Sequence, residues 1–313
     1  MRGFSPILLV IPIAIITLST ILITAVRGNV KFPNSRPISL SRSILRSPSP
    51  ISSPNSPSPS PSPSSSPESL MQSIVSYLAV PSPSPIPTPA ANANVSTGSN
   101  YTVVTYSLGS TVITDSANDD DCDNNCPTKS LAQFISDNGG RAGINGTYFC
   151  PSDYSWCAGK VNSTDFPIWN NRKKKWMNAS KLFWGGRGMM VFRPGSAQFF
   201  ADAASSGAPS NITGGIVNYP SLLAGGNVVF SDSSLSAGDK LRQKGTRNGI
   251  GFGNGKVFLV VGRNVDMNDM VSIFKSLGAT DALNTDGGGS SALYDGGYKV
   301  GPGRSLPNAV IIK

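Results

Sequence analysis

A proline- and serine-rich tract limits which part of this chain can fold. Residues 47–89 hold 13 of the 25 prolines, mostly in Ser-Pro repeats that are interrupted by one short apolar stretch, residues 70–80. Such a tract cannot bury enough apolar surface to build a core, and it forms an extended, semi-rigid spacer instead. We therefore expect a linker over residues 31–98 and a packed domain over residues 99–313.

An uncharged apolar run of 23 residues, Phe4 to Val26, precedes the linker. It is long enough to cross a bilayer as a helix and longer than the apolar centre of a cleaved signal peptide. Residues 1–30 are therefore expected to be an uncleaved membrane anchor, with a cleaved signal segment as the alternative. The basic residues after the run favour a cytoplasmic domain by the positive-inside rule, whereas the cysteines favour the opposite side.

The domain sequence alternates short apolar runs with Gly, Asn, Asp and Ser, which is typical of a strand-rich fold. Two segments have helical spacing, residues 128–136 and residues 266–277, and the second begins at a capping Asp266 and stops at Gly278. The expected strands are 101–106, 111–114, 189–193, 197–200, 228–230, 256–261, 292–294 and 309–312. The pattern predicts a single α+β domain with a central sheet and a few helices.

Histidine is absent from the chain and glutamate nearly so, which limits the kinds of catalytic site that the domain can form. The chain has no histidine, which excludes a Ser-His-Asp triad, an imidazole base and a histidine-ligated metal. Its single glutamate, Glu68, lies in the linker. A catalytic carboxylate in the domain must therefore be an aspartate.

The net charge of +9 is divided between the two parts of the chain. Six basic residues against Glu68 give +5 over residues 1–100, and 20 basic residues against 16 aspartates give +4 over the rest. No aromatic-flanked basic stretch of the kind that binds nucleic acid stands out, apart from the run at residues 172–176. That run is either a solvated loop or a contact for an anionic polymer.

All four cysteines lie in the domain: Cys122, Cys126, Cys150 and Cys157. An even number of cysteines beyond an export-type segment predicts two disulfides, whose pairing the sequence leaves open. The spacing does not match the usual zinc knuckles. We therefore expect the domain to lie outside the cytoplasm, in the periplasm or at the cell surface, or to be secreted if the first segment is cleaved.

Alternating carboxylates at Asp119, Asp121 and Asp123 resemble the oxygen ligands of a calcium loop. The loop lacks the glycine and the terminal glutamate of an EF-hand. It is interpreted either as an acidic surface loop or as a structural calcium site.

The segment from Leu283 to Tyr294, LNTDGGGSSALY, carries the most chemical information. Gly287, Gly288 and Gly289 leave their main-chain N–H groups unobstructed, so an anion can approach them. Two hydroxyl donors, Ser290 and Ser291, and one carboxylate, Asp286, lie beside these glycines. A tight Asp-Gly turn is the structural alternative.

This segment closely resembles the C-terminal signature of the phosphodiester glycosidase family. Residues 143–149, GINGTYF, resemble the INGxYF segment of that family. Residues 247–251 resemble its Arg-x-x-x-Gly segment, and residues 304–309 its Arg-x-x-Pro-Asn segment. The resemblance covers residues 100–313, but the insert at residues 150–183 has no counterpart in it.

The resemblance implies an enzyme that hydrolyses a sugar-1-phosphodiester and releases the sugar from a phosphate-linked glycan or glycoconjugate at the cell envelope. No cofactor is required for this. The implied catalytic carboxylate is Asp286. Asp281 is the nearest candidate for a second one, with a structural role in its loop as the alternative. The implied substrate-binding residues are Asn145 and Asn308 for the sugar, and Arg247, Arg304 and residues 287–291 for the phosphate. The structural alternatives are ion pairs for the two arginines, a turn at Asn145 and a structural role for Asn308.

Such a substrate suits a domain without histidine or glutamate. Ordinary glycosidases use a carboxylic acid to protonate a poor leaving group. A sugar-1-phosphodiester releases a phosphate monoester, a weak base, so arginines and backbone N–H groups can stabilise most of the developing charge. The alternative function is a non-catalytic, envelope-tethered module that binds a carbohydrate or an anionic polymer with the same residues.

Overall fold

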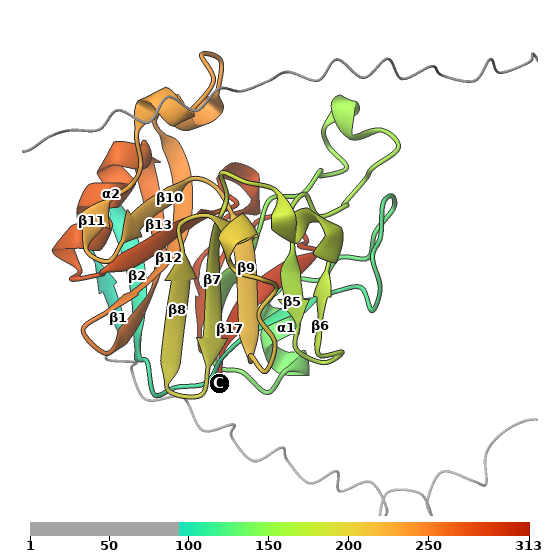
Figure 1. Ribbon diagram of the computed structural model, residues 1–313, viewed down its shortest axis with the longest axis horizontal. Helices are drawn as coiled ribbons and strands as arrows, with labels where there is room; N and C mark the ends of the chain where they lie inside the picture. The colour runs from blue at the N-terminus through green and yellow to red at the C-terminus, as the bar shows by residue number, and fades with distance from the viewer. Residues whose placement is uncertain (1–93) are drawn as a thin grey trace, which may run out of the picture. The chain divides into compact units, whose positions relative to one another are not determined.

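The computed structural model describes residues 94–313, so the predicted anchor and nearly all of the predicted linker lie outside the described residues (Figure 1). No helix within residues 94–313 is long and apolar enough to cross a membrane. The prediction of a strand-rich domain with few helices is confirmed. The expectation of one central sheet is wrong, because the strands form three antiparallel sheets that flank a shared core.

The largest sheet has seven strands, and one of its inner strands leads into the candidate active site. Their order is β1 (Val95–Thr97), β2 (Tyr101–Ser107), β13 (Lys256–Val265), β12 (Gly245–Gly253), β14 (Asp281–Thr285), β10 (Ser221–Ala224) and β11 (Asn227–Val228). The expected strand at 228–230 is thus mostly wrong, since β11 ends at Val228. β12 pairs with β13 on one side and with β14 on the other.

Strand β12 was not expected as a strand because it is rich in glycine. Its sequence, GTRNGIGFG, lacks the alternating apolar pattern of an ordinary strand. A Cβ atom on Gly249 would lie 2.7 Å from the Phe274 ring, and one on Gly251 would lie 2.8 Å from it. The glycines therefore let Phe274 pack directly on the strand backbone.

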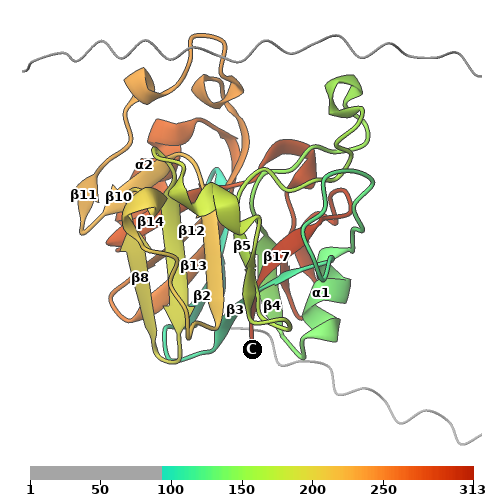
Figure 2. The same cartoon turned by 45° about the vertical axis from the view of Figure 1, so that its right-hand side comes forward.

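The second sheet carries the other half of the site. Its order is β16 (Tyr298–Val300), β15 (Leu293–Asp295), β4 (Ala142–Asn145), β17 (Asn308–Ile312) and β3 (Val112–Ser116). Helix α1 (Leu131–Asp137) packs beside β4 and β17 through Leu131, Phe134 and Ile135 (Figure 2). The helix starts three residues later than expected because Ser130 is its N-cap and Lys129 pairs with Leu306.

The third sheet contains part of the insert. Its order is β6 (Lys175–Met177), β5 (Ile168–Asn170), β9 (Gly214–Asn218), β7 (Gly188–Arg193) and β8 (Ser196–Phe200). Buried residues from all three sheets, among them Ile144, Ile216 and Ile250, form one core cluster. Burial of this apolar surface holds the three sheets together.

Helix α2 (Met267–Ser276) confirms the second predicted helix. Asp266 caps it and forms a capping box with Asp269. Its buried face contains Met270 and Phe274, which pack against the largest sheet.

The four cysteines form two disulfides, as predicted. Cys122 pairs with Cys126, and Cys150 pairs with Cys157. Each bond closes a short local loop rather than joining distant elements.

The acidic loop and the basic run, which lie far apart in the sequence, neutralise each other. Asp119 forms ion pairs with Arg172 and Lys173, and Asp120 pairs with Lys175. Arg172 also pairs with the buried Asp115 at 2.9 Å. The basic run is therefore largely occupied by contacts within the protein.

Candidate active site

Three strand ends, one from each sheet, meet at the candidate site. β14 leads into Asp286, β4 leads into Tyr148, and β9 leads into Tyr219. A cavity of about 920 Å³ opens at this point. Its lining residues include Tyr148, Tyr154, Trp156, Lys160, Asp165, Phe166, Lys181, Trp184, Arg187, Tyr219, Lys240, Arg247, Asn284, Asp286, Gly287 and Gly288.

Buried asparagines join the three strand ends. The Asn145 amide donates to the main-chain oxygen of Asp286 at 2.6 Å, and the Asn248 amide donates to the same oxygen at 2.6 Å. Asn218 donates to the Asn284 main-chain oxygen at 2.9 Å. All four asparagines are at most 1% exposed. This network fixes the backbone that carries Asp286, because each buried amide is costly to leave unpaired.

Asp286 has an unusual carboxyl group. Burial raises its pKa from 3.8 to about 7, although hydrogen bonds from Ser290 and from the Gly287 N–H, together with the charge of Arg304, act in the opposite direction. The Gly287 N–H donates to its Oδ1 at 2.9 Å. Near neutral pH the group can therefore both accept and donate a proton.

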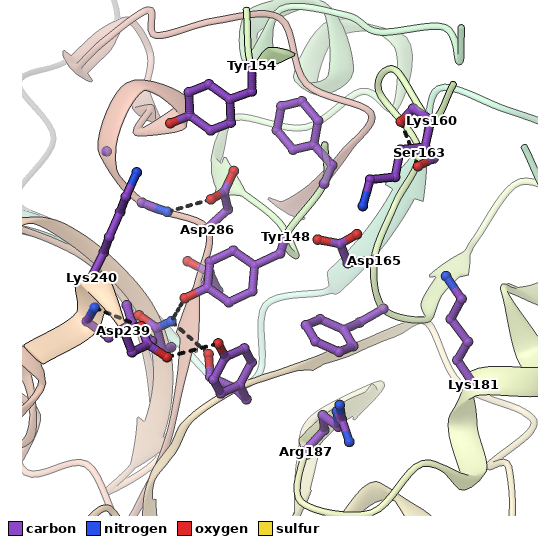
Figure 3. Close-up of a pocket in the computed structure, with 18 of the residues that line it drawn as sticks. Tyr148, Tyr154, Lys160, Ser163, Asp165, Lys181, Arg187, Asp239, Lys240 and Asp286 are labelled. Carbon is purple, nitrogen blue, oxygen red and sulfur yellow. Dashed lines mark hydrogen bonds between the residues drawn. The ribbon is translucent and has the colours of Figure 1, made fainter. Parts of the chain in front are cut away.

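Tyr148 provides a donor beside Asp286 (Figure 3). Its hydroxyl oxygen accepts a hydrogen bond from the Asn284 amide at 2.6 Å, which leaves its own hydrogen available. Burial, followed by the Asp286 charge, raises the pKa of Tyr148 well above 10, so the hydroxyl stays neutral. An aromatic wall is formed by three rings, those of Tyr148, Phe166 and Tyr219. Tyr219 contacts each of the other two edge to face, and Tyr148 and Phe166 are tilted against each other.

Asp165 is a second carboxylate on the cavity wall. Burial raises its pKa, against the opposing charges of Lys181 and Lys160, and its charge in turn raises the pKa of Asp286. The sequence candidate for a second carboxylate, Asp281, does not line the cavity. It accepts hydrogen bonds from the Gly225 N–H and the Thr280 hydroxyl instead.

The two arginines of the site have different surroundings. Arg247 lines the cavity, and its guanidinium donates to the main-chain oxygens of Lys240 and Gln243. Arg304 does not line the cavity. It donates to Ser290 Oγ at 3.1 Å and pairs with Asp153 at 2.6 Å. Contact of Arg304 with a substrate phosphate stays a prediction.

The two predicted sugar-binding asparagines are buried and make contacts within the protein. Asn145 Oδ1 accepts from Asn248 and from the Ala292 N–H, and Asn308 Oδ1 accepts from the Thr147 N–H at 2.8 Å. Neither lines the cavity. Their contact with a sugar stays a prediction, whereas their position supports a role in holding the site together.

The Gly-Ser segment, residues 287–291, reaches the cavity through its first two residues. Gly287 and Gly288 line the wall, whereas Gly289 packs against the Arg304 guanidinium. Ser290 and Ser291 are buried. A phosphate contact by the last three residues stays a prediction.

The residues proposed as calcium ligands are scattered. Asp119 is paired with cations, Asp121 accepts from the Asn178 N–H, and Asp123 lines the cavity. No cluster of three or more potential metal ligands occurs within residues 94–313. Calcium binding stays an untested prediction.

Sequence reasoning missed Asp165 as a functional candidate and did not single out Tyr148, Tyr219 or Lys240. Tyr148 had a signal, since it belongs to the GINGTYF segment. No sequence signal marks Asp165, because it lies in the insert. Only the fold brings it into the same cavity as Asp286.

The solved structures that this chain resembles include three with 11% to 16% sequence identity. The catalytic domain of zebrafish N-acetylglucosamine-1-phosphodiester alpha-N-acetylglucosaminidase, auto-inhibited by its pro-peptide, is 16% identical with a TM-score of 0.49 over 68% of this chain and 75% of that one. A hypothetical protein from Synechocystis is 14% identical, TM-score 0.44, over 70% of this chain and 60% of that one. A putative exported protein from Burkholderia pseudomallei is 11% identical, with a TM-score of 0.40 over 68% of this chain and 73% of that one.

The chain thus spans about 60% of the length of the Synechocystis protein. No curated protein matches the sequence. The family model described as phosphodiester glycosidase matches residues 138–313, which is more than half of the chain and includes every predicted catalytic and substrate-binding residue. On this match, the chain belongs to the phosphodiester glycosidase family.

Proposed function

We propose that this protein hydrolyses a sugar-1-phosphodiester by breaking the bond between the anomeric carbon and the phosphate oxygen. The observation that carries the proposal is the position of Asp286. Its carboxyl, with a pKa of about 7, lies in the cavity beside Arg247 and the start of the Gly-Ser segment. The carboxyl also belongs to the sequence signature of the family.

In the proposed reaction, ionised Asp286 accepts a proton from water while the water oxygen bonds to the anomeric carbon. The carbon–oxygen bond to phosphate breaks, and its electron pair leaves with the phosphate monoester. Tyr148 is well placed to donate a hydrogen bond to the substrate, since its own hydrogen is not used by Asn284. The products are a free sugar and a phosphate monoester.

Cationic groups would stabilise the leaving phosphate. Arg247 and Lys240 both line the cavity. The backbone of Gly287 and Gly288 adds to this surface. Because a phosphate monoester is a weak base, charge stabilisation can replace an acid catalyst, and no cofactor enters the reaction.

The cellular setting is part of the proposal. Two disulfides support a domain outside the cytoplasm, because such bonds are rare in reducing compartments. The apolar run from Phe4 to Val26 would then anchor the domain to the envelope.

The test is an assay of the purified full chain on two matched substrates, a methyl sugar-1-phosphodiester and the corresponding methyl glycoside without phosphate. We expect sugar release from the phosphodiester to be faster by about 100-fold or more, because methyl phosphate is a much weaker base, and so a much better leaving group, than methoxide. Equal rates would indicate an ordinary glycosidase. Binding without turnover would favour the non-catalytic module.

A further inference from the structure

Two tryptophans on the cavity wall have large exposed faces. Trp156 is 62% exposed and Trp184 is 48% exposed. Trp156 lies in the insert at residues 150–183, and Trp184 directly follows it. Large aromatic faces open to water at a cavity are typical of ligand-binding surfaces.

The first tryptophan belongs to a group that we call the loop rim: Tyr154, Trp156 and Lys240. The two rings lie against each other with centroids 4.5 Å apart. The Lys240 ammonium lies 5.7 Å from the Tyr154 ring and 5.5 Å from the Trp156 ring. The disulfide between Cys150 and Cys157 closes the loop that carries both aromatic residues.

The second tryptophan belongs to a group that we call the second rim: Lys181, Trp184 and Arg187, which lie in and after the short helix η2 (Ala179–Phe183). The Lys181 ammonium lies 5.6 Å from the Trp184 ring, and the Arg187 guanidinium lies 5.7 Å from it. Each rim therefore combines an exposed aromatic face with cationic groups.

The two rims flank the proposed catalytic groups. Figure 3 shows Tyr154 and Lys240 on one side of Asp286 and Tyr148, with Lys181 and Arg187 on the other side near Asp165. A ligand that touches both rims must pass over the two carboxyls. A cavity of about 920 Å³ is near the upper end of the range for small-molecule sites, which is roughly 300–1,000 Å³.

The charge of the wall complements a phosphorylated ligand. Its basic residues are Lys160, Lys181, Arg187, Lys240 and Arg247, and its acidic residues are Asp123, Asp165, Asp239 and Asp286. Burial disfavours the ionised form of two of these aspartates, Asp165 and Asp286. The wall is thus net positive at neutral pH and supplies cations on both sides of the carboxyls.

We propose that the two rims bind an extended phosphodiester-linked glycan, with sugar units on both sides of the bond that is cleaved. Sugar rings stack on Trp156 and Trp184, and the neighbouring phosphates contact the lysines and Arg187. This inference rests on the proposed function for the cleaved bond, and it names the substrate as an oligomer rather than a single sugar phosphodiester.

The kinetic test compares a nitrophenyl sugar phosphodiester with oligomers of N-acetylglucosamine 1-phosphate that contain two, four and six repeats. The measured quantity is the ratio of kcat/KM for an oligomer to kcat/KM for the nitrophenyl substrate. We expect the ratio to rise with length in the wild-type chain. Trp156→Ala and Trp184→Ala should each lower it by about three- to tenfold, the value of one aromatic stacking contact.

Phe183→Ala is the matched control. Phe183 is 64% exposed and directly precedes Trp184, but it does not line the cavity. Its loss should leave the ratio unchanged. A ratio that does not depend on length, or an equal loss in Phe183→Ala, would overturn the proposal.

A binding experiment separates this inference from the proposed function. If neither substrate is hydrolysed, the proposed function fails, and calorimetric titration of the full chain with the six-repeat oligomer still tests the rims. We expect binding that weakens about three- to tenfold in each tryptophan variant. Equally tight binding of inorganic polyphosphate, or no binding at all, would overturn the rim proposal.

Discussion

At the scale of single residues, Asp286 determines the expected pH dependence. Its pKa of about 7 predicts that kcat/KM rises with pH through neutrality as the carboxylate forms. The chain has no histidine, so no imidazole titrates in the same range. A pH–rate profile that is flat between pH 5.5 and 8.5 would contradict the role of Asp286 as a base.

Asp286→Asn tests the same role directly. Asparagine cannot accept the proton from water, so we expect turnover of a sugar phosphodiester to fall by about 100-fold or more. The measurement is kcat under saturating substrate, with circular dichroism to confirm the fold. A folded variant with activity within about threefold of wild type would show that this assignment is wrong.

The ionised form of Asp286 should lower the free energy of unfolding of the chain. Its pKa is higher in the folded chain than in the unfolded chain, so the folded state binds this proton more tightly, and stability falls as pH rises from about 4 to 7. Above pH 7 we expect Asp286→Asn to be more stable than wild type by about 2 to 4 kcal/mol, and equal to it near pH 4.

Urea unfolding at pH 4 and pH 8 measures this difference. Asp120→Asn serves as the control, because Asp120 is exposed and forms only a surface ion pair. A change of less than about 0.5 kcal/mol is expected there. A wild type that is more stable at pH 8 than Asp286→Asn would refute the buried-acid explanation.

The variant Asn145→Ala tests whether the asparagine network stabilises the backbone of the site. In Asn145→Ala, the Asp286 oxygen, the Asn248 amide and the Ala292 N–H lose a partner. We expect a loss of about 2 to 4 kcal/mol in the free energy of unfolding. Asn227→Ala, at an exposed position, should change it by less than about 0.5 kcal/mol, and an equal effect of both variants would argue against the network.

At the scale of elements, the packing of α2 depends on the bare backbone of β12. Gly249→Ala would place a Cβ 2.7 Å from Phe274 and 3.0 Å from the Leu283 oxygen, so we expect a loss of about 1 to 3 kcal/mol in stability. Gly238→Ala is the control, since nothing lies within 4 Å of its added Cβ. Thermal unfolding compares the two, and a neutral Gly249→Ala would contradict this packing.

The sequence predicted elements well where local chemistry determines them. The capping Asp266 and the stop at Gly278 predicted α2 to within one residue at each end. β12 could not be predicted, because its glycines are required by a helix that follows in the chain. β5 and β6 also escaped prediction, since each has three residues and too little periodicity to be recognised.

At the scale of the whole molecule, the site combines parts that only the fold brings together. The signature segment identified Asp286 and its glycines from local sequence alone. The second carboxylate, Asp165, lies 121 residues earlier in the chain. The aromatic wall joins Tyr148 and Tyr219, which follow strands of two different sheets. No local pattern predicts such a meeting of strand ends.

The disulfides provide a test of the cellular setting. If the domain folds outside the cytoplasm, as we propose, both pairs form, and the intact mass of unreduced protein from its native source should show no free thiol. Alkylation under denaturing, non-reducing conditions followed by mass spectrometry measures this. Four alkylated cysteines would place the domain in a reducing compartment.

Hydrolysis in water enriched in oxygen-18 shows which bond of the substrate the protein breaks. The full chain would be incubated with UDP-N-acetylglucosamine, and the mass of the released UDP would be measured. Attack at the anomeric carbon predicts UDP without oxygen-18, because its bridging oxygen comes from the substrate. UDP that carries one oxygen-18, or UMP with sugar phosphate as products, would mean attack at phosphorus and would refute the proposed glycosidic cleavage.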